Sequence, residues 1–206
     1  MSVEGSNAPP LSGIRILDFS RIIAGPLCTQ QLSDMGAEVI KIENPDGGDD
    51  TRRFAEPGVA GLSHFFLAFN RNKRSVALDI RKPEALEILH TLAADCDVLV
   101  QNFRPGVMKR FSLDYDSMAE RHPHLIYLSI SAYGLDGPMA HRPGFDPVLQ
   151  AEFGMMSMTG EPDGPALRHP LSIIDTFTAL HAVGAVTAAL YARKTTGRGQ
   201  HLDLTL

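Results

Sequence analysis

The sequence of 206 residues predicts an α/β fold of the Rossmann-like kind, in which helices flank a mostly parallel sheet. Short apolar segments alternate with segments of helical periodicity along most of the chain, which is typical of right-handed βαβ crossovers. No repeat of fixed period and no low-complexity tract interrupts this alternation. The chain is 44% hydrophobic and 21% charged, but no apolar run approaches the roughly 20 residues that span a bilayer.

The first predicted βαβ unit lies near the start of the chain. Residues 14–17 form a short apolar strand, and residues 26–35 form a helix with proline in its first turn. Gly36 is placed to end this helix, and residues 38–42 form the next strand. The pattern then continues with strands at 75–79, 97–100 and 125–130, and with a helix at 83–94 that carries apolar residues at helical spacing.

The composition of the chain changes after Ser131. Glycine and proline punctuate short segments as far as Pro165, as they do in surface and ligand-facing loops. A long helix is predicted from about Asp175 to Lys194, with Gly197 and Gly199 to end it, and residues 201–206 alternate like the start of a strand. We expect a flexible N-terminus over 1–10 and one domain over 11–206, as the first part of a longer protein or as a short version that needs a partner.

Composition narrows the classes of function. A net charge of −5 argues against broad nucleic-acid binding, and the small, polar start of the chain argues against a secretory signal and for the cytoplasm. Cys28 and Cys96 are expected to be reduced thiols, too few for a zinc site. His122 and His124 lack a third ligand at suitable spacing, so we expect surface histidines and no metal.

The connection after the first strand is where a dinucleotide-binding enzyme carries three glycines that let backbone amides approach a pyrophosphate. Residues 18–26 contain only Gly25, which disfavours an NAD-dependent oxidoreductase. The carboxyl ends of the strands still offer a crevice for a nucleotide-like ligand. Basic residues concentrate at 70–74 and 104–110, either as phosphate contacts or as a solvated rim. Phe103 and its neighbours follow a strand directly, so adenine could stack there.

Asp175 stands at the start of the longest predicted helix. A carboxylate there is usually an N-cap that accepts backbone N–H bonds. The cap is compatible with a role as nucleophile, because the helix dipole would keep the carboxylate ionised. Met155, Met156 and Met158 are interpreted as core residues rather than as a substrate wall.

The order of motifs resembles one family, the class III CoA-transferases (CaiB/BaiF), which also contains the α-methylacyl-CoA racemases. The resemblance rests on residues 11–19, 24–26, 36–43, 72–75, 102–106, Asp175 and 196–200. It implies a Rossmann-like large domain that binds coenzyme A, and two subunits that interlock in complete members. Because such members are about twice this length, a C-terminal small domain and a glycine-rich loop are expected to be missing from these 206 residues.

The resemblance also implies the chemistry. Asp175 would attack an acyl thioester to give a mixed anhydride, then an aspartyl-CoA thioester, from which a carboxylic acid collects the CoA. The residues that would line the CoA site are Ile23, Ala24, Asn44, Asn72, Lys73, Asn102, Phe103, Arg104, Arg110, Gly144 and Phe145. Arginine and lysine suit the phosphates, and Phe103 suits the adenine.

The two branches of the family differ at one position. Racemases place a histidine in a Gly-His-Asp segment as one of two bases, whereas this chain has Gly144-Phe145-Asp146. Because phenylalanine cannot carry a proton, CoA transfer is favoured, with Asp146 as a second acidic group near the nucleophile. The alternatives are an α-methylacyl-CoA racemase and a non-catalytic CoA-binding domain or subunit. A homodimer or a second chain is the expected partner.

Overall fold

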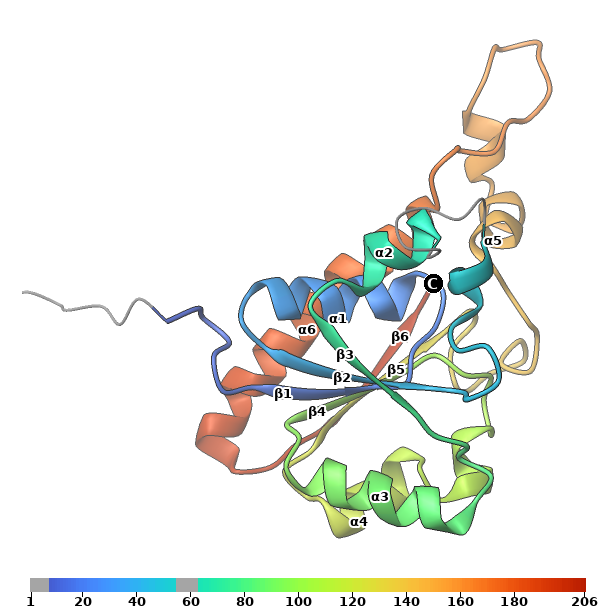
Figure 1. Cartoon of the computed structure of the whole chain (residues 1–206). Helices are drawn as coiled ribbons and strands as arrows, with labels where there is room; N and C mark the ends of the chain where they lie inside the picture. Colours follow the sequence, from blue (N-terminus) through green and yellow to red (C-terminus); the bar gives the residue numbers. More distant parts are fainter. Residues whose placement is uncertain (1–7, 55–62) are drawn as a thin grey trace, which may run out of the picture.

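The structure is a computed structural model that describes residues 8–54 and 63–206. All strands pair in parallel within one sheet of order β3-β2-β1-β4-β5-β6 (Figure 1). The strands are β1 (Arg15–Asp18), β2 (Glu38–Glu43), β3 (Lys73–Ala77), β4 (Val98–Gln101), β5 (Ile126–Ser131) and β6 (His201–Thr205). The α/β class and the parallel sheet predicted from the sequence are confirmed.

Six α-helices and three 3₁₀ turns connect the strands within the described residues. The helices are α1 (Ala24–Asp34), α2 (His64–Asn70), α3 (Pro83–Ala94), α4 (Tyr115–Arg121), α5 (Asp146–Glu152) and α6 (Ile173–Thr196). The turns are η1 (Asp50–Arg53), η3 (Met108–Phe111) and η4 (Met155–Met158). The three helices with a clear periodicity in the sequence, α1, α3 and α6, are confirmed to within two residues at each end.

Helices cover both faces of the sheet. On one face α1 and α6 pack over Ile16, Val98 and Leu128, and on the other face α3 and α4 pack over Leu17, Leu99 and Tyr127 (Figure 1). Successive residues of a strand point to opposite faces, so each strand contributes to both layers of the core. The described chain therefore forms three layers, helix, sheet and helix.

The strand order reverses between β1 and β4. From β1 the chain builds outward through β2 and β3, and it then returns to place β4 on the other side of β1. The loops that leave the carboxyl ends of β1 and β4 consequently diverge and open a crevice, which is where ligands bind in open α/β sheets. This topology predicts the place of the functional site before any side chain is considered.

Gly36 and Gly197 end the helices that they were predicted to end. Their φ angles of 104° and 66° lie in the left-handed region, which favours glycine over residues with a Cβ. Helix α6 is long and apolar enough to span a bilayer by length and composition alone. Seven of its residues are buried, and it packs against α1, β5 and β6, so we describe it as a helix of the folded domain.

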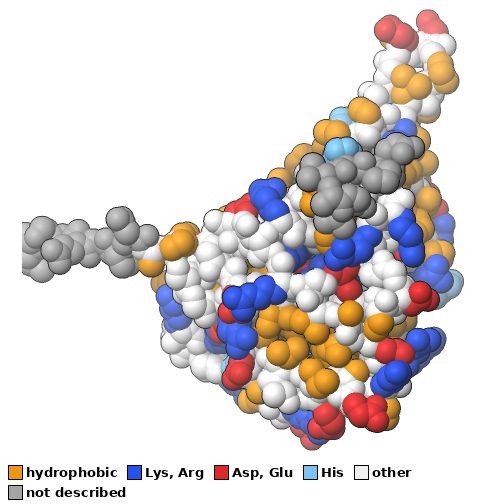
Figure 2. Space-filling model, viewed as in Figure 1, with side chains coloured by type: hydrophobic (Ala, Val, Ile, Leu, Met, Phe, Trp, Pro, Cys, Tyr) orange, Lys and Arg blue, Asp and Glu red, His pale blue; other side chains and the backbone are white. Residues whose placement is uncertain are grey.

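A segment after α5 projects from the body as an arm, residues 153–171 (Figures 1 and 2). Met158 lies on it and is 80% exposed, so the expectation that Met155, Met156 and Met158 fill the core is wrong. No residue of η4 is buried, because the arm projects away from the helices and strands of the described chain (Figure 1). The expectation that His122 is a surface histidine is also wrong, because it is buried and stacks on His90.

Candidate active site

A cavity of about 260 Å³ opens at the carboxyl ends of β1 and β4. Three loops line it, each after a strand: residues 21–24 after β1, residues 102–105 after β4 and residues 142–145 after β5. The start of α6 completes the wall with Asp175. Of the residues predicted to bind CoA, the cavity collects Ile23, Ala24, Asn102, Phe103, Arg104, Gly144 and Phe145.

Asp175 is the third residue of α6, not its cap. Ser172 occupies the cap position without a side-chain cap bond. The cap is instead the carboxylate of Asp146, whose Oδ2 accepts the backbone N–H groups of Ile174 at 2.7 Å and Asp175 at 3.2 Å. The other oxygen of Asp146 accepts a hydrogen bond from Gln150. This corrects the N-cap interpretation of Asp175 and leaves its carboxylate free to face the cavity.

The two carboxylates have different environments. Asp146 is 3% exposed and accepts three hydrogen bonds, whereas Asp175 is only partly buried and its carboxylate accepts none in the described chain. Burial, and then the nearby charge of Asp146, raise the pKa of Asp175 to about 7. From the sequence we expect the helix dipole to keep Asp175 ionised. With this raised pKa, the carboxyl group is only partly ionised at neutral pH. A carboxylate of raised pKa is a better nucleophile once it has lost its proton.

The loop after β4 stands against the loop after β1. The amide of Asn102 donates to the carbonyl of Arg21 and accepts from its N–H, both at 2.8 Å. Phe103 carries the Arg21 guanidinium over its ring, 5.2 Å from the centroid. The side chain of Asn102 is thus committed to the protein backbone, and its part in a ligand site is to hold Arg21 in place.

Three guanidinium groups border the cavity, from Arg21, Arg104 and Arg142. Arg21 pairs with Asp50 at 3.2 Å, and Arg142 pairs with Glu152 and lies over the ring of Tyr133. Among the described residues, no hydrogen bond or ion pair occupies the Arg104 side chain. In a chain of net charge −5, these cations in the wall of the cavity favour an anionic ligand.

A second cavity of about 270 Å³ adjoins the first, and Arg21 and Phe103 line both. Asn44 lies here, as predicted for a ligand contact, after the end of β2. So does a segment that the sequence analysis missed, Leu78 to Arg81, which follows the end of β3. The signal was available, because residues directly after a parallel strand lie at the same edge as Phe103.

Three predicted contacts do not reach either cavity. Asn72 bonds Asp34 at the surface, at 3.0 Å. Lys73 begins β3, and its Nζ turns under α1 to contact Asp18, Asn70 and the carbonyl of Pro26. Burial lowers the pKa of Lys73 to about 8, although the carboxylate of Asp18 opposes the shift. Arg110 borders a separate open groove with Arg81 and Phe111.

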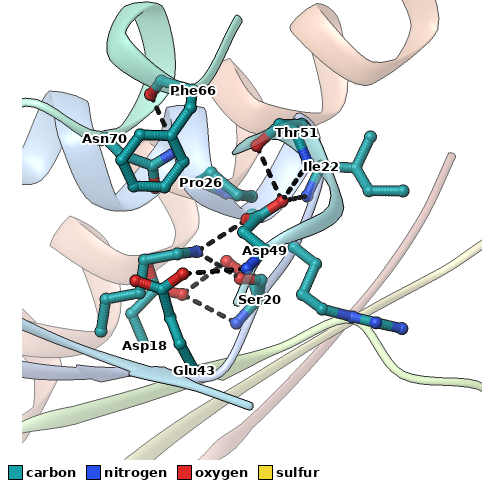
Figure 3. Close-up of polar contacts among 12 residues, drawn as sticks. Asp18, Ser20, Ile22, Pro26, Glu43, Asp49, Thr51, Phe66 and Asn70 are labelled. Atoms are coloured by element: carbon teal, nitrogen blue, oxygen red, sulfur yellow. Dashed lines mark hydrogen bonds and ion pairs between the residues drawn. The ribbon is translucent and has the colours of Figure 1, made fainter. Parts of the chain in front are cut away.

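Lys73 forms a buried ion pair with Asp18, at 3.1 Å, and Figure 3 shows the polar contacts around Asp18. Burial would raise the pKa of Asp18, but Lys73, Lys41 and the hydroxyls of Ser20 and Thr29 hold it at about 2. The sequence suggested that Lys73 contacts a phosphate. In the structure its ionic partner is instead the carboxylate of Asp18. The local sequence pattern could not reveal the contact between Lys73 and Asp18, because the two residues are 55 positions apart.

Comparison with known proteins agrees with this geometry. The family described as CoA-transferase family III matches residues 11–206. The chain belongs to CoA-transferase family III. The CoA-transferases most like it include succinyl-CoA:glutarate CoA-transferase of Mus musculus, 46% identical over 96% of this chain, and succinate–glutarate CoA-transferase of Agrobacterium fabrum, 42% identical over 96%.

A solved structure of the CaiB/BaiF family from Brucella suis matches with a TM-score of 0.92 and 42% identity over 96% of this chain. The chain spans about half the length of these relatives: 45% of the mouse protein, 51% of the Agrobacterium protein and 53% of the Brucella chain. The relatives from mouse and Agrobacterium are named as CoA-transferases, and this chain shares their family. Among the described residues, no cluster of three or more potential metal ligands is found.

Proposed function

We propose that the protein moves CoA from an acyl-CoA donor to a carboxylic acid acceptor through an aspartyl-CoA thioester on Asp175. The observation that carries the proposal is the position of Asp175. Two carboxylates, Asp146 and Asp175, lie at the start of α6. Within the described residues only that of Asp175 accepts no hydrogen bond, and Asp175 lines the cavity. Asp146 stays behind it as the cap and as the charge that tunes its pKa.

The steps balance without a net proton or electron. The Asp175 carboxylate attacks the thioester carbonyl, the C–S bond breaks, and CoA leaves as the thiolate from a mixed anhydride. The thiolate then attacks the Asp175 carbonyl, so the donor acid leaves as a carboxylate and Asp175 becomes the CoA thioester. The acceptor carboxylate repeats the two steps in reverse and releases Asp175. A covalent relay of this kind divides one difficult exchange into easier steps.

The two cavities suit the two ends of CoA. In this proposal the adenosine and its phosphates lie in the second cavity and groove, near Phe103, Arg81 and Arg110, where guanidinium groups can bind phosphate oxygens. The pantetheine arm passes Arg21 and enters the first cavity, with the thioester beside Asp175. Arg21 and Phe103 line both cavities, which supports a continuous path between them.

We further propose a dicarboxylic acid as the acceptor. The relatives from mouse and Agrobacterium are named for succinate or succinyl-CoA and for glutarate, whose acids carry two carboxylates. After one carboxylate reacts with Asp175, the second needs a cationic partner, and Arg104 and Arg142 border the same cavity.

The racemase alternative lacks a second base at the expected place. Phe145 lines the cavity and is 59% exposed, so its ring occupies the position where the racemases of this family carry histidine. Exchange of deuterium at the α-carbon of a bound acyl-CoA would support racemisation. A non-catalytic CoA-binding domain would differ from a CoA-transferase in that it would bind CoA but form no covalent adduct on Asp175.

The direct test is the mass of the protein after mixing with an acyl-CoA. We expect an adduct of the mass of CoA less water on Asp175, which hydroxylamine removes and which Asp175→Asn does not form. Asp163→Asn, an exposed carboxylate on the arm, is the matched control and should form the adduct. Absence of the adduct in a protein shown to bind CoA would contradict the proposal.

A further inference from the structure

The loop between β1 and α1 is held in an unusual way. Five successive backbone polar groups, from the N–H of Ser20 to the N–H of Ile22, all bond to side chains and none to another backbone group in the described chain. The partners come from four separate segments: Asp18, Lys41, Asn102 and Asp49 (Figure 3 labels Asp18, Ser20, Ile22 and Asp49). The sheet ladder ends at Phe19, and these side chains take over from it.

The loop needs that support because its conformation is strained. Ile22 has φ of 72°, in the left-handed region that a β-branched residue rarely adopts. Such a conformation persists only where the surroundings determine it. Ile22, Ile23 and Ala24 line the cavity that contains Asp175, so the strain lies in the wall against which the thioester would bind.

Asp49 is the residue that fixes the strained position. Its Oδ1 accepts the N–H of Ile22 at 3.3 Å and both the N–H and the hydroxyl of Thr51, and its Oδ2 lies 3.0 Å from Lys41 Nζ. Lys41 Nζ in turn donates to the Ser20 carbonyl at 2.7 Å. The two residues line the second cavity, but their side chains are at most 1% exposed, so their polar atoms are directed at the loop and each other and offer a ligand almost no surface.

We propose that Asp49, with Lys41, is a positioning residue for the acyl-transfer step: it sets the Ile22–Ala24 wall at the distance from Asp175 that the thioester carbonyl requires. The inference rests on the proposed function for its kinetic readout. Displacement of a binding wall by about 1 Å can cost about 100-fold in rate, while the rest of the ligand still binds. The effect of Asp49 should therefore fall on the rate of adduct formation rather than on CoA affinity.

Asp97 offers a closely matched control. It too accepts a backbone N–H, that of Arg15 at 2.8 Å, and pairs with a cation, Arg193 at 2.6 Å. It precedes β4 and so lies at the opposite edge of the sheet from the cavity. Loss of Asp97 removes the same kinds of contact without touching the Ile22 loop.

The experiment compares Asp49→Ala, Asp49→Asn and Asp97→Ala in the purified protein. We measure the single-turnover rate of adduct formation, the Kd for CoA, the Tm, and hydrogen exchange of the peptide that contains Ile22. For Asp49→Ala we expect a rate about 100-fold lower, a Kd within about threefold of the parent and faster exchange at Ile22. Asp49→Asn keeps an acceptor oxygen for Ile22, so we expect a smaller loss of rate, and it serves if Asp49→Ala does not fold.

Asp97→Ala should lower the Tm and leave the rate and the Ile22 exchange within about threefold of the parent. The inference is overturned if Asp49 and Asp97 variants lose rate in proportion to their loss of Tm, or if exchange at Ile22 does not change in the Asp49 variants. If the parent protein forms no adduct, the proposed function fails by itself. The exchange measurement then still decides whether Asp49 positions the loop.

Discussion

The raised pKa of Asp175 has a consequence for stability. Its pKa is about 7 in the folded chain and 3.8 as an isolated side chain, so the folded state binds the proton more tightly. Stability is therefore lost as the pH rises from about 4 through 7, where the ionised carboxylate faces an unfavourable site. Asp175→Asn removes that cost, and we expect it to raise the free energy of unfolding by about 1–2 kcal/mol at pH 8.

The same variant should differ little from the parent near pH 3, because Asp175 is then mostly protonated in both the folded and the unfolded chain. Denaturant unfolding at the two pH values measures the difference. Glu161→Gln, an exposed carboxylate on the arm, should leave stability unchanged at both. A loss of stability at pH 8 for Asp175→Asn would show that the carboxylate is stabilised by its surroundings, contrary to the raised pKa.

Asp146 combines a structural contact with an electrostatic effect on its neighbour. Its negative charge is the second cause of the raised pKa of Asp175, after burial. For Asp146→Asn we expect the acid limb of the pH–rate profile for adduct formation to move to lower pH. We also expect a loss of about 1 kcal/mol in stability, because Asp146 caps the first turn of α6.

Ser172→Ala is the control for that capping role. Ser172 occupies the cap position but makes no side-chain cap bond, so its replacement should change neither stability nor the pH profile. An equal loss of stability in the two variants would place the cap on Ser172 and contradict our assignment.

Helix α1 packs so closely against the loop after β1 that the position of Gly25 has no room for a side chain. A Cβ at this position would lie 2.2 Å from the Cβ of Ser20, which Asp18 holds in place. We expect Gly25→Ala to cost about 1–3 kcal/mol of stability through overpacking, and to displace the Ser20–Ile22 loop. Thermal and denaturant unfolding measure the loss.

Gly184→Ala provides the opposite case in another helix. Gly184 lies inside α6, and a Cβ there would meet nothing within 4 Å. We expect it to stabilise the chain by about 0.5–1 kcal/mol, because alanine loses less backbone entropy than glycine on folding. Stabilisation by both substitutions to a similar degree would mean that helix propensity outweighs any contact with Ser20 and that this contact does not explain Gly25.

Element length explains which parts of the fold the sequence could predict. The strands and α1, α3 and α6 have enough periodic residues to be recognised. Helices α2, α4 and α5 have seven residues each, about two turns, and were not predicted. Ordered motifs identified Asp175 and most of its cavity, but the contacts of Lys73 with Asp18 and of Asp146 with α6 join distant segments, and only packing of the whole chain reveals them.

At the scale of the whole molecule, the arm leaves apolar surface uncovered. Phe153, Met158 and Leu171 are each more than 60% exposed on it. Exposed apolar residues of this extent are typical of surfaces that contact another chain. We expect the purified protein to associate with a second copy of itself, and Met158→Glu to weaken that association in light scattering. Asp163→Lys, a charge change on the same arm, should not, and a monomeric parent protein would contradict the prediction.

Ligand binding should stabilise the described chain as a whole. The two cavities draw their walls from loops after β1, β2, β3, β4 and β5, so a bound CoA contacts both halves of the sheet. A ligand that binds only the folded state adds about 2.7 kcal/mol at 100 times its Kd, which corresponds to a Tm increase of about 5–11 °C for a chain of this size. NADH at the same concentration should have no effect, because the loop after β1 lacks the three glycines that bring backbone amides to a pyrophosphate. Thermal unfolding with CoA, with dephospho-CoA and with NADH separates these cases. A Tm raised by NADH and unchanged by CoA would assign the crevice to a dinucleotide and remove the basis for placing a thioester beside Asp175.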